Sequence, residues 1–287
     1  MAARRGGAAW VWWMGGLLAF LAVWNGLASL NPVYSAERML WPMEFAVRRI
    51  VQDPDSIPQA EVGRTLENLR KVIGKYPGTI TASRAQLLMV QVHLARKEYA
   101  QSRGAAEKVI AEYPNLAVQV IDAYKAIAAS YLAEEAWKKA LDAYRILLQK
   151  QTFHPRVQDV PMRMVGVARE KMPDAGDSVL KEAIRHYRTV TERFGRSDLS
   201  TFLANQRLAG CYLLSARWEE AAKIYETLAM AYPFRPEVVA WVRNVDELGK
   251  KRLNDPSRGG ALAQKFAQAH PGRRQLVERW LTPAVQK

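Results

Sequence analysis

The feature that most constrains this chain is a proline or glycine that recurs just after each amphipathic helix of the sequence. These residues are Pro77, Pro114, Pro155, Gly195, Pro233 and Pro271, spaced 37 to 41 residues apart. A repeat of this length holds two helices, and such helix pairs must stack on one another to bury their apolar faces. The sequence therefore predicts an all-α solenoid, which is a binding surface first and an enzyme only on further evidence.

The residues inside the repeat indicate which kind of solenoid it is. In one copy small residues precede Tyr212 on the first helix, and Trp218, Ala221 and Tyr225 follow with aromatic-x-x-Ala-x-x-x-aromatic spacing on the second. Two further copies contain Ala128, Tyr131, Trp137, Ala140 and Tyr144, and Val90, His93, Tyr99, Ser102 and Ala106. This pattern resembles the tetratricopeptide (TPR) repeat, in which small residues let two helices approach and aromatics fill the space between them. We expect a TPR-type α-solenoid of about five helix hairpins, clearest over 80–235.

The residues at the helix ends indicate which group of TPR proteins the chain resembles. The doublets Tyr76-Pro77, Tyr113-Pro114 and Tyr232-Pro233 resemble TPR proteins of the bacterial cell envelope, such as the lipoprotein BamD and the TolA-binding periplasmic protein. The chain departs from both, because it has no N-terminal Cys to receive a lipid and no heptad segment before its repeats. The resemblance implies a non-enzymatic adaptor in the envelope, with a role in outer-membrane or envelope biogenesis, and names no partner.

The N-terminus predicts export. The run 8–24 follows Arg4-Arg5 and has no polar side chain; its length lies between that of a cleavable signal and that of a spanning helix. Small residues around 26–28 and 33–35 would allow cleavage, so a removed signal and an uncleaved anchor both remain open. A buried core helix is disfavoured because a TPR stack would not cover a helix that is apolar all round. The arginines keep the N-terminus inside, which places the repeats across the inner membrane, in the periplasm.

These inferences divide the chain into four segments. The first, 1–36, is the signal peptide or signal-anchor helix, and 37–58 is a linker with a helix leading into the repeats. The TPR solenoid covers 59–281, with Gln275 to Leu281 as a capping helix, since terminal repeats must cover the open end of the stack. Residues 282–287 form a tail.

No catalytic, cofactor-binding or metal-binding group emerges from the sequence. The four histidines are His93, His154, His186 and His270, each on a different repeat, whereas metal sites use closely spaced ligands. His93 occupies an aromatic core position, and Cys211 precedes Tyr212 on a helix; both are expected to be buried structural residues. We predict no strands, and therefore no glycine-rich phosphate loop after a strand. The sequence thus favours a protein that is not an enzyme and needs no cofactor.

The partner surface is expected on the concave face lined by the first helix of each repeat, where TPR proteins bind peptides or partner helices. Side chains of this mixed basic and amide character suit peptide backbone and carboxylates. The predicted residues are Arg84, Leu87, Gln91, Asp122, Lys125, Ala129, Leu203, Gln206 and Gly210.

Positive charge is concentrated at the C-terminal end. The chain has a net charge of +14, and half of it falls after Gly249. The ordinary interpretation is a solvated end of the stack. The alternative is a basic patch for an acidic surface, such as an anionic lipid, a glycan of the cell wall or an acidic protein; nucleic acid is not expected of an exported chain. The candidate residues are Lys250, Lys251, Arg252, Arg273 and Arg274.

Overall fold

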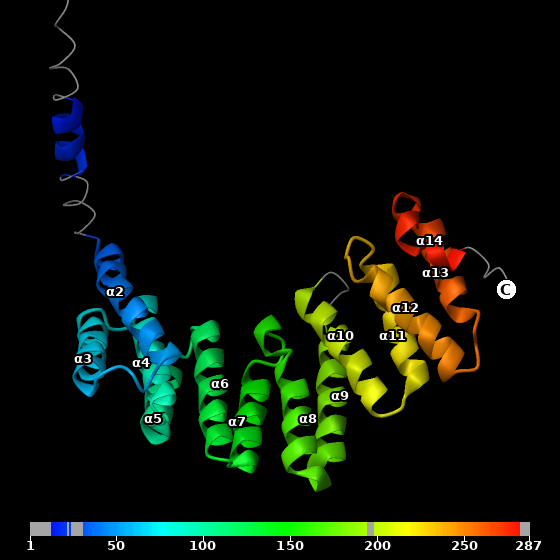
Figure 1. Cartoon of the computed structure of the whole chain (residues 1–287), viewed down its shortest axis with the longest axis horizontal. Coiled ribbons are helices and arrows are strands. Elements are labelled where there is room, and N and C mark those ends of the chain that lie inside the picture. The colour runs from blue at the N-terminus through cyan, green and yellow to red at the C-terminus, as the bar shows by residue number, and fades with distance from the viewer. Residues whose placement is uncertain (1–12, 22, 24–30, 194–197, 282–287) are drawn as a thin grey trace, which may run out of the picture. The chain divides into compact units, whose positions relative to one another are not determined.

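The computed structural model describes residues 13–21, 23, 31–193 and 198–281, and every regular element among them is a helix (Figure 1). The chain divides into two compact units, residues 1–136 and 137–287. Consecutive helices in both units pack as hairpins, so the predicted fold class, an all-α TPR-type solenoid, is confirmed. The predicted repeat end at Gly195, the predicted tail 282–287 and most of the predicted leader lie outside the described residues.

In the first unit, five helices from Pro32 onward pack against one another. Each packs on the next, and the first helix of a hairpin also packs on the first helix of the next hairpin, as α2 does on α4 and α4 on α6. This is the arrangement that stacking of TPR hairpins requires. The helices are α2 (Pro32–Gln52), α3 (Gln59–Lys75), α4 (Ile80–Ala95), α5 (Tyr99–Glu112) and α6 (Ala117–Ala133).

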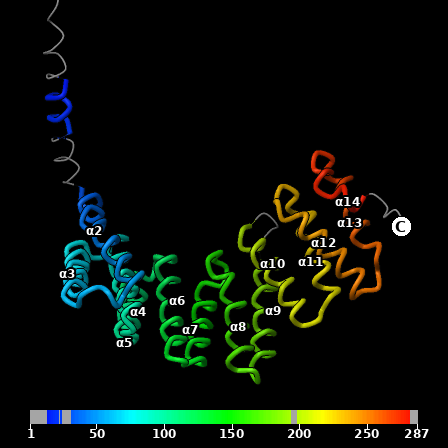
Figure 2. The backbone as a smooth tube through the Cα atoms, in the orientation of Figure 1, coloured from blue at the N-terminus to red at the C-terminus, as the bar shows by residue number. Residues whose placement is uncertain are grey.

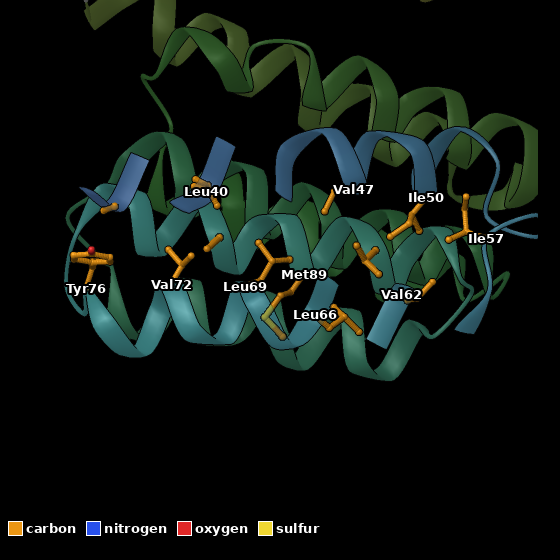
Figure 3. Close-up of a cluster of buried hydrophobic side chains, with 13 residues drawn as sticks. Leu40, Val47, Ile50, Ile57, Val62, Leu66, Leu69, Val72, Tyr76 and Met89 are labelled. Atoms are coloured by element: carbon orange, nitrogen blue, oxygen red, sulfur yellow. The ribbon is translucent and has the colours of Figure 1, made fainter. Parts of the chain in front are cut away.

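Helix α2 belongs to this stack. It begins at an N-cap, because the Asn31 side-chain oxygen accepts a hydrogen bond from the Val33 amide at 2.9 Å. Its buried residues recur with helical spacing and point toward Leu69 and Met89 of the neighbouring helices, as Figure 3 shows. Fully burying such a side chain contributes roughly 1.5–3 kcal/mol. The buried residues of α2 are Ala36, Leu40, Val47 and Ile50.

Hairpin α2–α3 therefore adds a pair ahead of the five that the sequence predicts. Helix α2 begins inside the range 1–36 that the sequence assigns to the leader, and it runs through most of the predicted linker. Pro42 lies within the helix at an exposed position, where it cannot donate the backbone hydrogen bond of an ordinary helical residue.

The second unit continues the hairpin pattern; Figure 2 shows the backbone reversing direction between α10 and α11. Its α-helices are α7 (Trp137–Lys150), α8 (Val160–Lys171), α9 (Gly176–Arg193), α10 (Leu199–Leu214), α11 (Trp218–Ala231), α12 (Val238–Lys251), α13 (Arg258–Ala269) and α14 (Glu278–Leu281). Its 3₁₀ turns are η1 (Pro155–Val157), η2 (Pro173–Ala175) and η3 (Pro271–Val277).

Two places where the sequence fits the repeat poorly have structural explanations. The long link before α9 is largely helical, because the turn η2 leads directly into Gly176. Gly259, in the first turn of α13, allows a close approach: a Cβ built there would lie 2.4 Å from Asp246 Cβ on α12. At the end of the stack, the predicted helix from Gln275 to Leu281 is the end of η3 followed by the single turn α14, and both elements pack on α13.

The turns inside several hairpins use an unusual backbone conformation. In the part of the chain that the structure describes, four residues other than glycine have positive φ angles, a region that side chains with a Cβ disfavour. They are Lys97 (60°), Glu135 (56°), Ala216 (54°) and Asn254 (52°). The first three each lie two residues after the end of a helix and share one hydrogen-bonded turn, whereas the fourth lies three residues after the end of α12.

The aromatic positions of the repeat divide into two groups. Tyr144 and Tyr225 are buried, as the repeat predicts. Trp137 and Trp218, the first residues of α7 and α11, are only half-buried. A cation lies against each ring, with Lys171 Nζ 5.6 Å and Arg252 Cζ 5.0 Å from the ring centroids. The two tryptophans are thus partly buried, with a cation over one side of each ring.

Candidate functional site

The predicted partner-binding residues are accessible. Gln91 is exposed and the other eight are half-buried. Three of them, Leu203, Gln206 and Gly210, lie on α10 in the second unit. In the first unit Arg84, Leu87 and Gln91 lie on α4, and Asp122, Lys125 and Ala129 lie on α6.

Arg84 is engaged within the chain. Its Nη1 donates to both carboxylate oxygens of Glu37 on α2, with N–O distances of 2.9 and 2.7 Å. Its Nη2 donates to Glu44, about two turns further along α2. Thr81 Oγ1 also donates to Glu37, at 2.6 Å. Burial by itself would lower the pKa of Arg84, but the hydrogen bonds and charges of the two glutamates outweigh it and raise the pKa.

The structure thus gives Arg84 a different role from the predicted one. Its guanidinium holds α2 on α4 and neutralises two carboxylates, so it is not an unpaired cation awaiting a partner's carboxylate. The side chain is 39% exposed, so solvent screens the interaction and its contribution to stability is moderate.

A shallow groove of about 520 Å³ lies between α2 and α4 beside this ion pair. Its apolar part comes from both helices, and Arg48 and two side-chain amides provide polar groups at its edges. Of the nine predicted residues only Gln91 lines it. The groove is formed by Glu44, Val47, Arg48, Val51, Gln52, Leu88 and Gln91.

Sequence reasoning placed a helix within 37–58 but treated it as a lead into the repeats, so it did not assign the α2 wall of the groove to the partner surface. The usable signal was the spacing of Ala36, Leu40, Val47 and Ile50, which recurs every three to four residues or a multiple of that and marks a buried helix face.

The five residues of the predicted basic patch do not form one cluster. Arg252 lies over Trp218, at the first residue of α11, whereas Arg273 lies over Phe234, beyond the last residue of that helix. A helix of 14 residues is about 21 Å long, more than twice the screening length of about 8 Å at physiological ionic strength. All five residues are exposed, but the charges act as two separate groups.

The lysines of this set also have carboxylate neighbours. Lys250 Nζ lies 2.8 Å from Asp246 Oδ2, and Lys251 Nζ lies 3.3 Å from Glu247 Oε2, each one turn earlier on α12. Arg274 lines a separate hollow beside Trp280. The positive charge available to an acidic partner is therefore smaller than the sequence count suggests.

His93 and Cys211 have the structural roles that the sequence predicts. His93 is buried, and its Nδ1 lies 2.5 Å from Glu98 Oε2, as expected of a core histidine with a hydrogen-bond partner. Cys211 is fully buried against Met162, and burial raises the pKa of its thiol to about 12, so it is protonated and unreactive at neutral pH. Within the described ranges, no group of three or more His, Cys, Asp or Glu side chains is placed to hold a metal ion.

Residues 13–21 are helical, and their side chains are exposed. Among the residues that the structure describes, no helix is both long enough and apolar enough to cross a membrane. Much of the run 8–24 on which the export expectation depends lies outside those residues.

No family model matches the chain, and no curated protein does either. Among solved structures, a putative kinesin light chain of Podosopora anserina with nearly identical TPR-like repeats is 15% identical, with a TM-score of 0.41, over 69% of this chain and 95% of the other. PilF of Pseudomonas aeruginosa is 14% identical, with a TM-score of 0.36, over 83% and 99%. The APC/C hetero-tetramer Cut9–Hcn1 is 14% identical, with a TM-score of 0.26, over 92% and 58%. These similarities concern helical-repeat architecture and assign no activity or partner.

Proposed function

We propose that this protein is a non-enzymatic adaptor of the bacterial cell envelope that binds a partner peptide in the groove between α2 and α4. The groove itself is the observation that supports the proposal most directly. It is open, mixed in polarity and bordered by the α4 surface on which TPR-type stacks present their ligand-facing residues.

The chemistry of the groove favours an extended peptide. Val47, Val51 and Leu88 provide an apolar floor for a side chain, and Gln52 and Gln91 present amides that can both donate to and accept from peptide backbone. Arg48 adds one positive charge at the edge, while the carboxylate of Glu44 is held by Arg84. The preferred peptide therefore carries an apolar residue with an acidic residue near it.

A photo-crosslinking amino acid in place of Gln91 tests this assignment in cells. We expect it to form an adduct with a specific envelope protein, whereas the same amino acid in place of Gln101, an exposed glutamine of α5, should not. Gln91→Trp should fill the groove and weaken binding of the captured peptide about ten-fold or more, a loss of roughly 1.4 kcal/mol. Gln101→Trp is the matched control and should bind as wild type does.

The alternative is a factor that holds an anionic glycan or lipid through its basic C-terminal end. This function predicts a different response of ligand binding to salt and to mutation. Binding would weaken steeply with salt and would be lost when Lys250, Lys251, Arg252, Arg273 and Arg274 are changed to Gln. The affinity for such a glycan or lipid would be unchanged by Gln91→Trp. That outcome would exclude the groove as the functional surface.

The proposed location outside the cytoplasm has its own test. Residues 1–60 fused to a reporter that is active only after export should give activity, and replacing Arg4 and Arg5 with Glu should reduce it, because these charges hold the N-terminus inside. The mass of the mature protein separates a cleaved signal from an anchor. Activity of a reporter that works only in the cytoplasm, at the same junction, would contradict the proposed topology.

A further inference from the structure

Helix α2 has a second apolar surface, on the side opposite its buried face. At 3.6 residues per turn Tyr34, Trp41 and Phe45 fall on one stripe, away from Leu40 and Ile50. The three aromatics are 43%, 63% and 50% exposed. Trp41 and Phe45 pack edge to face with ring centroids 5.3 Å apart, so they form one aromatic cluster.

Positive charges border this aromatic stripe. Arg38 and Arg48 are exposed on the same side of α2, and Arg48 Cζ lies 5.7 Å from the centre of the Phe45 ring. The two acidic residues of the helix, Glu37 and Glu44, are turned toward α4 and neutralised by Arg84. The outer face of α2 therefore presents aromatics and cations with no acidic side chain among them.

We propose that this face of α2 lies on an anionic membrane surface. Tryptophan and tyrosine favour the interface between lipid headgroups and acyl chains, and nearby arginines are attracted to anionic headgroups. The positive charge of this face excludes a basic partner. Its exposed aromatic side chains suit the lipid–water interface better than they suit an aqueous groove.

A second argument rests on the proposed export, in which the apolar run 8–24 inserts into a membrane. The apolar run 8–24 ends at Trp24, and α2 begins at Pro32. Even fully extended, the residues between them span at most about 28 Å. Insertion of that run would hold α2 within this distance of the bilayer, where an interfacial face has lipid available at high local concentration.

The docked face is separate from the proposed peptide groove, so the two proposals can fail independently. The aromatic stripe lies on the outer side of α2, and the groove lies on the side of α2 next to α4; Arg48 and Gln52 border both. Membrane docking would therefore hold α2 from one side while the groove stays open on the other.

Full-length protein in lipid vesicles provides the test. Pro42→Cys places a nitrobenzoxadiazole label next to the aromatic stripe, and Glu67→Cys places it on an exposed position of α3 as the control. Native Cys211 is buried and protonated, so it does not compete for the label. In vesicles of phosphatidylcholine mixed with phosphatidylglycerol, we expect the label at position 42 to shift its emission to the blue and to lose quenching by iodide. The label at position 67 should do neither.

Two variants separate the contributions of the face. Trp41→Ser with Phe45→Ser should abolish the blue shift. Arg38→Gln with Arg48→Gln should lower the ratio of docked to undocked helix by roughly 25-fold, since each arginine near an anionic surface contributes roughly five-fold. A label at position 42 that stays open to iodide in these vesicles would overturn the proposal. So would an equal shift in pure phosphatidylcholine, or a shift that appears only when a protein extract is added.

Discussion

Replacing Tyr187 with alanine should lower the free energy of unfolding of the second unit by about 3–5 kcal/mol, the range for removing a large aromatic from a packed core. The Tyr187 side chain is fully buried in α9. Its hydroxyl donates to the backbone oxygen of Gln158 at 2.8 Å, and its ring packs edge to face on His186. The side chain thus ties α9 to the segment that joins α7 to α8. Denaturant unfolding followed by circular dichroism measures the loss.

The conservative variant Tyr187→Phe is the control for this measurement. It keeps the ring and leaves the Gln158 carbonyl without its donor, which should cost about 1–2 kcal/mol. An alanine variant no less stable than the phenylalanine variant would show that the ring does not fill a core position. Tyr225→Ala offers a second comparison in the same unit, since Tyr225 is also buried at the equivalent repeat position.

Lowering the pH from 7 to 4 should destabilise the second unit by about 3 kcal/mol through His186 alone. Burial lowers the pKa of His186 to about 4 from the usual 6.5. Below pH 6.5 the unfolded chain takes up a proton at this residue, whereas the folded chain does so only near pH 4. The unfolded state therefore binds more protons throughout this window, and stability falls as the pH decreases through it. Above pH 6.5 the residue is neutral in both states and makes no difference.

The hydrogen bonds around Gln158 determine which nitrogen of the neutral His186 ring carries the proton. Gln158 Nε2 donates to the carbonyls of Thr152 and His154 at 3.0 and 3.2 Å, so its Oε1 is left to face His186 Nε2 at 3.2 Å. The neutral ring satisfies this oxygen by donating from Nε2. A proton added at Nδ1 would place a charge in a buried site.

His186→Gln isolates this contribution from the carboxylates that also titrate in acid. The variant should show a shallower fall in unfolding free energy between pH 6.5 and 4 than wild type, with the two curves parallel at neutral pH. Parallel curves across the acidic window would contradict the proposed role. The measurement is a series of denaturant titrations at fixed pH for both proteins.

The helical repeats could be predicted because their signals are local. Tyr76, Tyr113 and Tyr232 are observed at the C-caps of α3, α5 and α11, where the sequence places helix ends. The burial of Cys211 and the partnered state of His93 also followed from their positions in the repeat. Each of these features depends on residues within one hairpin, where spacing alone determines which side chains meet.

The candidate site could not be predicted in the same way, because it depends on contacts between helices distant in sequence. Arg84 meets Glu37 and Glu44 only once α2 has packed on α4, and no spacing rule joins them. Arg258, in the first turn of α13, likewise binds Glu219 and Glu226 of α11 at 2.5 and 2.6 Å. The hydrogen bond from Arg258 is the largest cause of the lowered pKa of Glu219.

The strained turns have a consequence for how the repeats hold together. A residue such as Ala216, at a φ of 54°, costs about 1–2 kcal/mol relative to an ordinary turn. Every hairpin that contains such a turn is destabilised by this free energy, whereas the contacts that stabilise the fold lie largely between a hairpin and its neighbours. Within each unit, a single repeat cut from the chain should therefore be unstable, and folding should spread cooperatively from one hairpin to the next as in a one-dimensional array.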